Sequence, residues 1–398
     1  MRRSLIITSL SLLTAFFLLF ILPNLINSRE RYHFSSEYRI KQADALFSNH
    51  YSDSINTSIS KFYDRNSIAT TLFGNHYREL WSKEIQLPVF TGLDTLQFHK
   101  VGGGQQTTSI EMKTPNHKHY SFRSIDKDQS RVLPNWLINS ALRPLLRDQT
   151  SALNPYAAPV VASLSESLNI LHTNPAIYIL PYYSQVHDSI KLHLPGAVVI
   201  FEEELDSKWK DSKAFFEPVD VINTDEMLSA IQNTTIRLDT LEYLKCRIFD
   251  ILISDWDRHA GQWKWLVYDT LDHQIIRPFP IDRDMTFCRF NDGWVNTVVV
   301  NTTNKFKSFR KGEASVNDAA KKVTDLDILL LKGISQTSFK NVAIEIKKAL
   351  SEPVIEKAMT EYPPEIHKEI ASEQKATLID RLDHLESAST ELYNNINN

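Results

Sequence analysis

The spacing of apolar and polar positions predicts strands in the first half of the chain and mainly helices in the second. Alternation with a period of two begins near residue 96, after a polar stretch with only short helical patches at 38–47 and 67–80. Strands are predicted at 96–101, 107–113, 119–125, 176–181 and 197–201. Helical spacing predicts helices at 135–153, 156–171, 225–232, 236–254 and 365–393. The helix at 156–171 is expected to begin at Asn154-Pro155, a cap followed by a first-turn proline.

An uninterrupted apolar run occupies residues 5–22 and ends at Pro23. Eighteen helical residues span about 27 Å, close to the thickness of a bilayer core. Residues 1–28 are therefore predicted to be a signal-anchor that contacts the membrane through residues 5–22, or a signal peptide, although no small-residue cleavage site is evident. The basic pair before the run favours a membrane-anchored or secreted body outside the cytoplasm, in the cell envelope. Basic residues at 29–41 favour the alternative, an anchor facing the cytoplasm.

Length and composition fit a two-lobed folded protein. The chain has 398 residues, of which 42% are hydrophobic and 23% charged, with a net charge of -4. No basic field is available for nucleic acid, so nucleic acid is not expected as a partner. The two cysteines, Cys246 and Cys288, are expected to be small buried apolar residues, with a single bridge between them as the alternative. The predicted divisions are a leader and packing region at 29–95, a sheet lobe at 96–205, and a helical lobe with a C-terminal extension at 206–398.

Two acidic motifs flank one predicted hairpin. Asp257 lies in the run 255–262, and Asp282 lies in the run 280–284. Between them, strand-like segments at 262–269 and 274–281 are joined by a polar turn. Paired strands lie about 5 Å apart, so Asp257 and Asp282 are expected to face each other at the open end of the hairpin. Two carboxylates placed in this way can hold a divalent metal and accept a proton from a hydroxyl, as phosphoryl transfer requires.

A run of three glycines lies between the first two predicted strands. The chain has only ten glycines, and three of them are consecutive at 102–104. A glycine turn lets backbone N–H groups approach phosphates closely, although a plain tight turn is the alternative. No lysine-serine pair follows the run, so it is not a P-loop.

The two acidic motifs resemble those of atypical kinases. Asp257-Arg258-His259 resembles the catalytic loop of phosphatidylinositol kinases and of the secretory-pathway family-20 kinases. Pro280-Ile281-Asp282-Arg283-Asp284 resembles the metal-binding motif of those families, and is closer still to that of the spore-coat kinase CotH. The wider pattern, including 102–107 and 123–128, resembles an uncharacterised kinase-like domain of bacterial envelope proteins. The resemblance covers residues 96–300 and implies an α+β, bilobal protein-kinase-like fold, with a small antiparallel-sheet N-lobe and a mainly helical C-lobe, after an N-terminal membrane helix.

The resemblance also implies roles for the acidic residues. Asp257 would orient or deprotonate the acceptor hydroxyl, and Asp282 would bind the Mg²⁺ or Mn²⁺ that bridges the phosphates of ATP. Gln262 occupies the place of a further metal ligand but departs from the usual asparagine or acid. Asp284 or Asp255 would supply the missing charge.

For the nucleotide, the resemblance implies a cation on the third strand, where Arg123 stands in place of lysine and Lys127 follows. The acid that holds this cation would be Glu166 or Asp148. The acidic run 202–204 falls where the chain crosses between the lobes and meets adenine. The implied nucleotide-binding residues are Gly102, Gly103, Gly104, Arg123, Lys127 and Glu203.

Three functions are compatible with these motifs. The first is a phosphotransferase that moves the γ-phosphate of ATP to an unidentified hydroxyl on a protein, glycan or lipid. The second is a non-catalytic, pseudokinase-like binding module of the envelope, and the third is transfer of AMP by the same site. Against all three stands the possibility that the acids at 255, 257 and 282 are loop caps and salt-bridge partners of Arg258 and Arg283. Trp263 and Trp265 are expected to be core residues.

Overall fold

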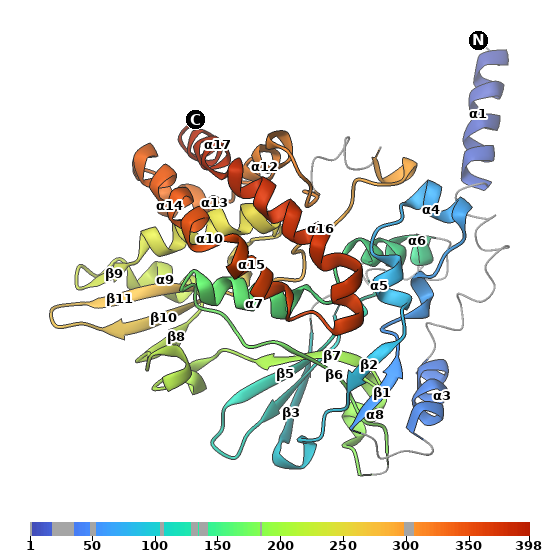
Figure 1. Cartoon of the computed structure of the whole chain (residues 1–398), viewed down its shortest axis with the longest axis horizontal. Coiled ribbons are helices and arrows are strands. Elements are labelled where there is room, and N and C mark those ends of the chain that lie inside the picture. The colour runs from blue at the N-terminus through green and yellow to red at the C-terminus, as the bar shows by residue number, and fades with distance from the viewer. Residues whose placement is uncertain are drawn as a thin grey trace.

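A five-stranded sheet, a four-stranded sheet and a set of helices make up a mixed α+β fold (Figure 1). The computed structural model describes residues 2–17, 36–47, 53–103, 107–128, 134, 142–183, 185–297 and 306–398.

The five-stranded sheet contains the five strands predicted between residues 96 and 201. Its order is β3-β4-β5-β7-β6, and every neighbouring pair is antiparallel. The strands are β3 Gln97–Gly102, β4 Ser109–Lys113, β5 His119–Ser124, β6 Ala176–Ile179 and β7 Val198–Glu203. The side chains of a strand alternate between its faces. One face therefore carries Ile110, Met112, Phe122 and Val199, which form a buried cluster with helix α8 (Asp188–His193). The other face carries Glu111, Arg123 and Glu202.

The four-stranded sheet contains the predicted hairpin. Strands β10 (Trp263–Asp269) and β11 (Gln274–Pro280) pair in antiparallel register, and the sheet order is β8-β10-β11-β9. The flanking strands, β8 (Asp220–Ile222) and β9 (Ile236–Leu238), are short. Trp263 and Trp265 are buried in the main core, as expected, where both rings contact Tyr243 of helix α10 (Thr240–Ile253). The hairpin is thus fixed to the helix that precedes the first acidic motif.

Helices dominate the chain after the hairpin, and in Figure 1 they gather at the top of the view, above the two sheets. They are α12 Glu313–Ala320, α13 Asp325–Leu331, α14 Gln336–Ala349, α15 Glu352–Met359, α16 Pro364–Asp383 and α17 Leu385–Asn397. Together with α10 they supply much of the main apolar core. The predicted helix at 365–393 is in fact two helices, which are divided at His384.

The segment at 53–95 packs against both parts of the fold. It holds β1 Ser54–Thr57, α4 Ser67–Phe73, α5 Arg78–Ser82 and β2 Ile85–Pro88, together with the short turns η3 Lys61–Tyr63 and η4 Leu93–Thr95. Strand β1 pairs with β2, and Trp81 is buried in the main core. The single helix predicted at 67–80 is wrong. Gly74 ends α4 with a φ of 93°, a conformation open to glycine and difficult for other residues.

Three other predicted helices differ from the structure. Residues 236–238 form β9, which pairs in parallel with β11, so the helix predicted at 236–254 begins only at Thr240. Helix α7 (Ala157–Ser167) begins after Tyr156 and not at Asn154-Pro155, because the Asn154 side chain accepts a hydrogen bond from the Tyr156 amide in the preceding turn. In the described part of 135–153, α6 (Leu142–Asp148) gives way to a 3-10 turn, η6 (Gln149–Ala152). The helix predicted at 225–232 is α9 (Thr224–Ala230).

The N-terminal helix α1 (Arg2–Phe16) stands apart from the rest of the fold in Figure 1. Its apolar side chains from Ile7 to Phe16 are exposed. Among the described residues, no helix has the length and apolar character needed to cross a bilayer. The predicted membrane helix at 5–22 is therefore not supported by these residues, and its last five positions, 18–22, lie outside them.

Cys246 and Cys288 are both buried free thiols. The alternative of a bridge between them is therefore wrong. Burial raises the pKa of Cys288 to about 12, so this thiol stays protonated in the core.

Candidate active site

The β10–β11 hairpin brings the two acidic motifs together. Trp263 lies opposite Pro280, and one residue further on the Ile281 amide donates to the Gln262 carbonyl at 3.1 Å. The Gln262 side-chain nitrogen lies 3.5 Å from an oxygen of Asp282. The residues that follow β11 therefore lie beside the loop that leads into β10, as the hairpin predicted.

Arg258 fixes the shape of the first acidic loop from beneath. Its side chain is fully buried and donates to the carbonyls of Gln262 and Ile281, which belong to the two sides of the hairpin. The same guanidinium contacts the carboxylates of Asp250 and Asp255. Burial disfavours the charged form of Asp255 and raises its pKa to about 6, although Arg258 opposes this shift. Asp255 is thus an ion-pair partner of Arg258, as the salt-bridge alternative had it.

Asp257 differs from its neighbours because its carboxylate has no partner among the described residues. The residue is half-buried, and among the described residues its side chain makes no hydrogen bond or ion pair. His259, two residues on, is exposed, and its ring accepts from the Gly261 amide at 3.1 Å, which caps the short turn η9 (Ala260–Gln262). The loop is therefore held by Arg258 and His259, while Asp257 remains available to a bound molecule.

A cluster of opposite charges joins the second acidic motif to the five-stranded sheet. One nitrogen of Arg123 on β5 lies 2.9 Å from Asp282 and 2.9 Å from Asp284. Lys127, just after β5, also contacts Asp284. The structure thus brings together four predicted site residues from segments more than 150 positions apart. The alternative of solvent-facing strand charges is excluded for Arg123 and Lys127.

Asp282 has a left-handed backbone conformation, which aspartate tolerates better than most residues with a Cβ. Its φ is 54°, in the left-handed region that residues with a Cβ rarely occupy. Such conformations cost on the order of 1 kcal/mol and collect at functional sites. Here the conformation accompanies a carboxylate that meets Arg123 on one side and Gln262 on the other.

The two carboxylates of this motif have unequal proton affinities. Burial acts to raise the pKa of Asp282, but Arg123, a hydrogen bond with Asp284 and Lys127 outweigh it and lower that pKa. Burial raises the pKa of Asp284 despite Arg123, and the charge of Asp282 adds to the increase. The pair titrates as a unit, and Asp282 keeps the negative charge that a cation needs.

The acid that accompanies Arg123 is Glu202 on the neighbouring strand. The Arg123 side chain lies 3.5 Å from Glu202, which also accepts from Thr173 at 2.7 Å. The two helical candidates were wrong. Asp148 forms a buried ion pair with Arg78, and Glu166 is exposed on α7. Glu202 was detectable in principle, because it lies on β7 two positions beyond the residue opposite Arg123 and so faces the same side.

The glycine turn lies at the same end of the sheet as Arg123. Gly102 pairs with Ser109, which in turn pairs with Arg123, so the three residues form one row across three strands. Neighbouring strands lie about 4.8 Å apart, which places Gly102 about 10 Å from the Arg123 backbone. A Cβ on Gly103 would meet the Thr107 carbonyl at 2.2 Å, and Gly103 has a φ of 113°, so this turn requires glycine. Gly104 lies outside the described residues.

Glu203 occupies a different position from the other predicted nucleotide ligands. It pairs with Tyr120 in the sheet, three positions from the row of Arg123, and its carboxylate binds the backbone and side chain of Asn174 at 2.7 and 2.9 Å. Its side chain is therefore engaged in fixing the turn before β6. A contact between adenine and the backbone here stays a prediction.

The residues around Asp282 fit a divalent metal. Carboxylate and amide oxygens are the ligands that Mg²⁺ prefers, and the Gln262 side-chain oxygen is a buried acceptor with no partner among the described residues. Asp282, Asp284 and Glu202 supply three carboxylates beside the two cations Arg123 and Lys127, so the cluster can carry net negative charge when all three acids are ionised.

Comparisons with known proteins give distant structural likenesses. Neither a protein-family model nor a curated protein matches the sequence. Among solved structures, the chain is similar to the Helicobacter pylori proinflammatory kinase CtkA, with 16% identity and a TM-score of 0.36 over 72% of this chain and 95% of that chain. A golgi casein kinase is similar with 12% identity and a TM-score of 0.31, over 90% of this chain and 90% of that chain. The Chaetomium thermophilum Rio2 kinase, in an ADP/Mg²⁺–phosphoaspartate complex, is similar with 11% identity and a TM-score of 0.28, over 81% of this chain and 98% of that chain. The TM-scores are low, so the likeness by itself assigns no activity to this chain.

Proposed function

We propose that the chain is an atypical kinase-like phosphotransferase that moves the γ-phosphate of ATP to a hydroxyl on a protein, glycan or lipid. The observation that carries the proposal is the contact of Arg123 with Asp282 and Asp284, beside a loop whose Asp257 carboxylate has no partner in the part of the chain that the structure describes. Cations from one part of the fold and carboxylates from another meet at one place, as phosphoryl transfer requires. As part of this proposal, residues 96–205 form an N-lobe and residues 206–398 form a C-lobe, with the boundary at about residue 205.

Each residue has a distinct task in the proposed reaction. Arg123 and Lys127 neutralise phosphate oxygens, and the N–H groups of the glycine turn approach them from the sheet. Asp282, with Gln262 and Asp284, would hold Mg²⁺ or Mn²⁺, which supplies charge neutralisation for the phosphates when bound. Asp257 accepts the proton of the acceptor hydroxyl as that oxygen attacks the γ-phosphorus, and the bond between this phosphorus and the β–γ bridging oxygen breaks to release ADP. The protein therefore positions and neutralises, and no covalent bond to the enzyme is needed.

One observation favours a second function, a non-catalytic nucleotide-binding or scaffolding module. Arg123 and Lys127 form ion pairs with the carboxylates of Asp282 and Asp284, and these ion pairs compete with a metal for the same oxygen atoms. In addition, the neutral side chain of Gln262 stands where an asparagine or an acid would be a metal ligand. Nucleotide binding and transfer therefore have to be measured separately.

The Asp282→Asn variant is expected to lose Mg²⁺-dependent ATP binding. Loss of a residue that only orients a metal ligand weakens metal affinity about 10- to 100-fold, so loss of a direct ligand should reach at least about 100-fold. Isothermal titration calorimetry with ATP, with and without Mg²⁺, measures the effect. Asp272→Asn, in the exposed turn of the same hairpin, is the matched control. Equal Mg²⁺-ATP affinity in the wild type and Asp282→Asn would contradict the metal assignment, and no binding by the wild type would favour a scaffold.

We also infer that residues 1–28 direct the body of the protein out of the cytoplasm. The exposed apolar side chains of α1 support attachment of this segment to a membrane. A reporter fused after residue 398 is expected to be active outside the cytoplasm, and a fusion without residues 1–28 should lose that activity. Activity of the full-length fusion in the cytoplasm alone would overturn export.

A further inference from the structure

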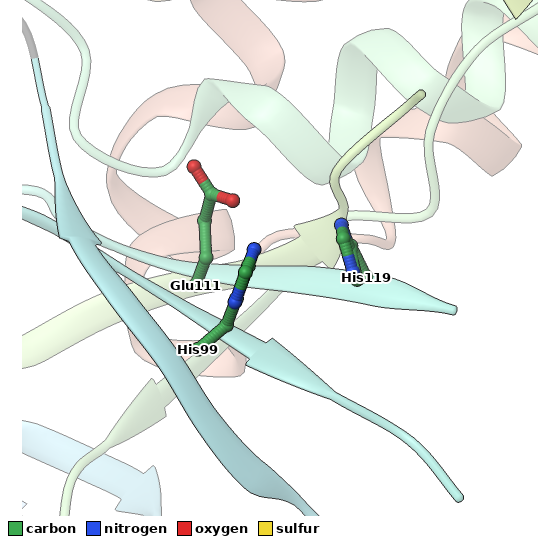
Figure 2. A group of neighbouring side chains, drawn as sticks. All are labelled: His99, Glu111 and His119. Carbon is green, nitrogen blue, oxygen red and sulfur yellow. The ribbon is translucent and has the colours of Figure 1, made fainter. Parts of the chain in front are cut away.

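Three metal-ligating side chains meet on the five-stranded sheet, apart from the Asp282 cluster. His99, Glu111 and His119 project to the same side of β3, β4 and β5 (Figure 2), and one ligand atom from each lies within 4.8 Å of the others. His119 precedes Arg123 by four residues on β5. At about 3.3 Å per residue, the two backbones lie about 13 Å apart, so the two sites do not share ligands.

A local irregularity of the sheet places His99 in this group. Phe98 pairs with Met112 and Lys100 pairs with Glu111, which leaves His99 as an extra residue on β3. A bulge of this kind changes the direction of a side chain, and here it puts His99 beside Glu111. His119 pairs with Lys113, two positions from Glu111 on β4, so both project from the same face.

The surroundings of both histidines suit metal binding. The Nδ1 of His119 lies 2.6 Å from the Asp206 carboxylate, which leaves its Nε2 free to bind a metal. A carboxylate behind a metal-binding histidine is a common arrangement that fixes the ring and raises its basicity. Asp206 is itself fixed, because its other oxygen accepts from the Lys208 amide at 2.8 Å. His99 has no hydrogen-bond partner among the described residues, and its ring lies 4.8 Å from that of His119.

Glu111 can supply the third ligand. One of its oxygens contacts the exposed Lys100 ammonium at 3.0 Å, which leaves the other oxygen for a metal. Bonds from zinc to nitrogen or oxygen are about 2.0–2.2 Å, so tetrahedral ligand atoms lie about 3.4 Å apart. The side chains therefore need to close by about 1.5 Å at most, which small side-chain rotations provide. The ordinary alternative is that Lys100 and Glu111 form a surface ion pair next to the rings of His99 and His119 by coincidence. That alternative does not explain the Asp206–His119 contact or the bulge that turns His99 toward Glu111.

We propose that His99, Glu111 and His119 bind a divalent transition metal of the zinc class. Two imidazoles and one carboxylate are a zinc ligand set, and three protein ligands leave a fourth position for water or another oxygen ligand. The bound metal links β3, β4 and β5, and through Asp206 it fixes the segment that follows β7. The site is independent of the proposed phosphotransfer site.

A Co²⁺ titration of the full chain, after removal of metals with a chelator, tests this site. Four-coordinate Co²⁺ absorbs visible light intensely, and Zn²⁺ should displace it with loss of the colour. One equivalent of Co²⁺ is expected to bind, and His99→Ala and Glu111→Gln should each abolish the absorption. Asp206→Asn, a positioning change, should weaken affinity about 10- to 100-fold and keep the spectrum. Zn²⁺ should also raise the melting temperature of the wild type, but not of Glu111→Gln.

Two control variants define the result that would overturn the proposal. His117→Asn changes an exposed histidine in the turn between β4 and β5 to a residue that also tolerates its φ of 61°, so it should bind Co²⁺ like the wild type. Asp282→Asn should also keep the visible spectrum, which separates this site from the phosphotransfer site. Undiminished absorption in Glu111→Gln, or no absorption in the wild type, rules out the site. Glu111→Gln removes only a half-buried charge, so its melting temperature in chelator should match that of the wild type.

Discussion

Replacement of Asp257 by asparagine is expected to reduce phosphate transfer about 10²- to 10⁴-fold and to leave Mg²⁺-ATP affinity unchanged. A positioned general base contributes about this factor, and an amide of the same shape cannot accept the proton. Binding should persist because the Asp257 side chain makes no contact with Arg123, Lys127 or Asp282 among the described residues. Single-turnover transfer from labelled ATP and calorimetric titration measure the two quantities on the same samples.

Asp272→Asn is the matched control for this experiment. It makes the same change in the exposed turn at the far end of the β10–β11 hairpin, and it should keep full transfer. The hypothesis of a base at Asp257 fails if Asp257→Asn transfers phosphate at the wild-type rate. Mass spectrometry of the modified acceptor distinguishes phosphate from AMP, so the same reaction also tests nucleotidyl transfer.

The sequence predicted the pairings that depend on local patterns. The hairpin at 263–280 followed from two strands of equal length around a polar turn, and the sheet strands followed from alternation. Together these predicted that Asp257 and Asp282 face each other at the open end of the hairpin. The structure shows Asp282 beside Gln262, and the approach of Asp257 to Asp282 stays a prediction. Contacts between distant segments were harder to predict, because no local pattern specifies them. The direct contact of Arg123 with Asp282 joins residues 159 positions apart, and only the assembled fold brings them together.

The failures of sequence reasoning have identifiable physical causes. Residues 236–238 have helical apolar spacing, but pairing with the edge of β11 determines their conformation. Glu202 was overlooked as the partner of Arg123 because the expected acid was sought on a helix, whereas a diagonal neighbour on the adjacent strand takes that place. The metal-ligating group at His99 depends on a bulge. A one-residue bulge changes which side chains share a face, and hydrophobic alternation does not reveal it.

The sequence predicted only one part of the buried ion-pair network beneath the Asp257 loop. Asp255 and Arg258 were recognised as possible salt-bridge partners, but their full network was not predicted. Asp250 lies within α10 and contacts Arg247, Arg258 and Arg283. Nothing in its position along the helical pattern indicates that it has these partners. The consequence is that the loop presenting Asp257 depends on charges buried several residues away from it.

Replacement of Arg258 by methionine is expected to lower the free energy of unfolding by about 3–5 kcal/mol. Methionine replaces the aliphatic stem of arginine but leaves the Asp250 and Asp255 carboxylates buried without this partner, and loss of one member of a buried ion pair has an effect of this size. It also frees the carbonyls of Gln262 and Ile281, which Arg258 holds together. Urea denaturation followed by tryptophan fluorescence measures the change. Phosphate transfer should fall as well, because the loop that positions Asp257 loses its support.

Arg277→Met on β11 provides the comparison that separates burial from charge. Arg277 is partly exposed and lies 3.7 Å from Glu242 and 4.0 Å from Asp239. Exposed pairs contribute about 0–1 kcal/mol, so this variant should unfold near the wild-type urea concentration. Arg258→Lys should fall between the two, because it restores the charge but cannot reach both carboxylates and both carbonyls at once. If Arg258→Met were as stable as Arg277→Met, the network would not determine the loop, and the geometry of Asp257 would need another source of rigidity.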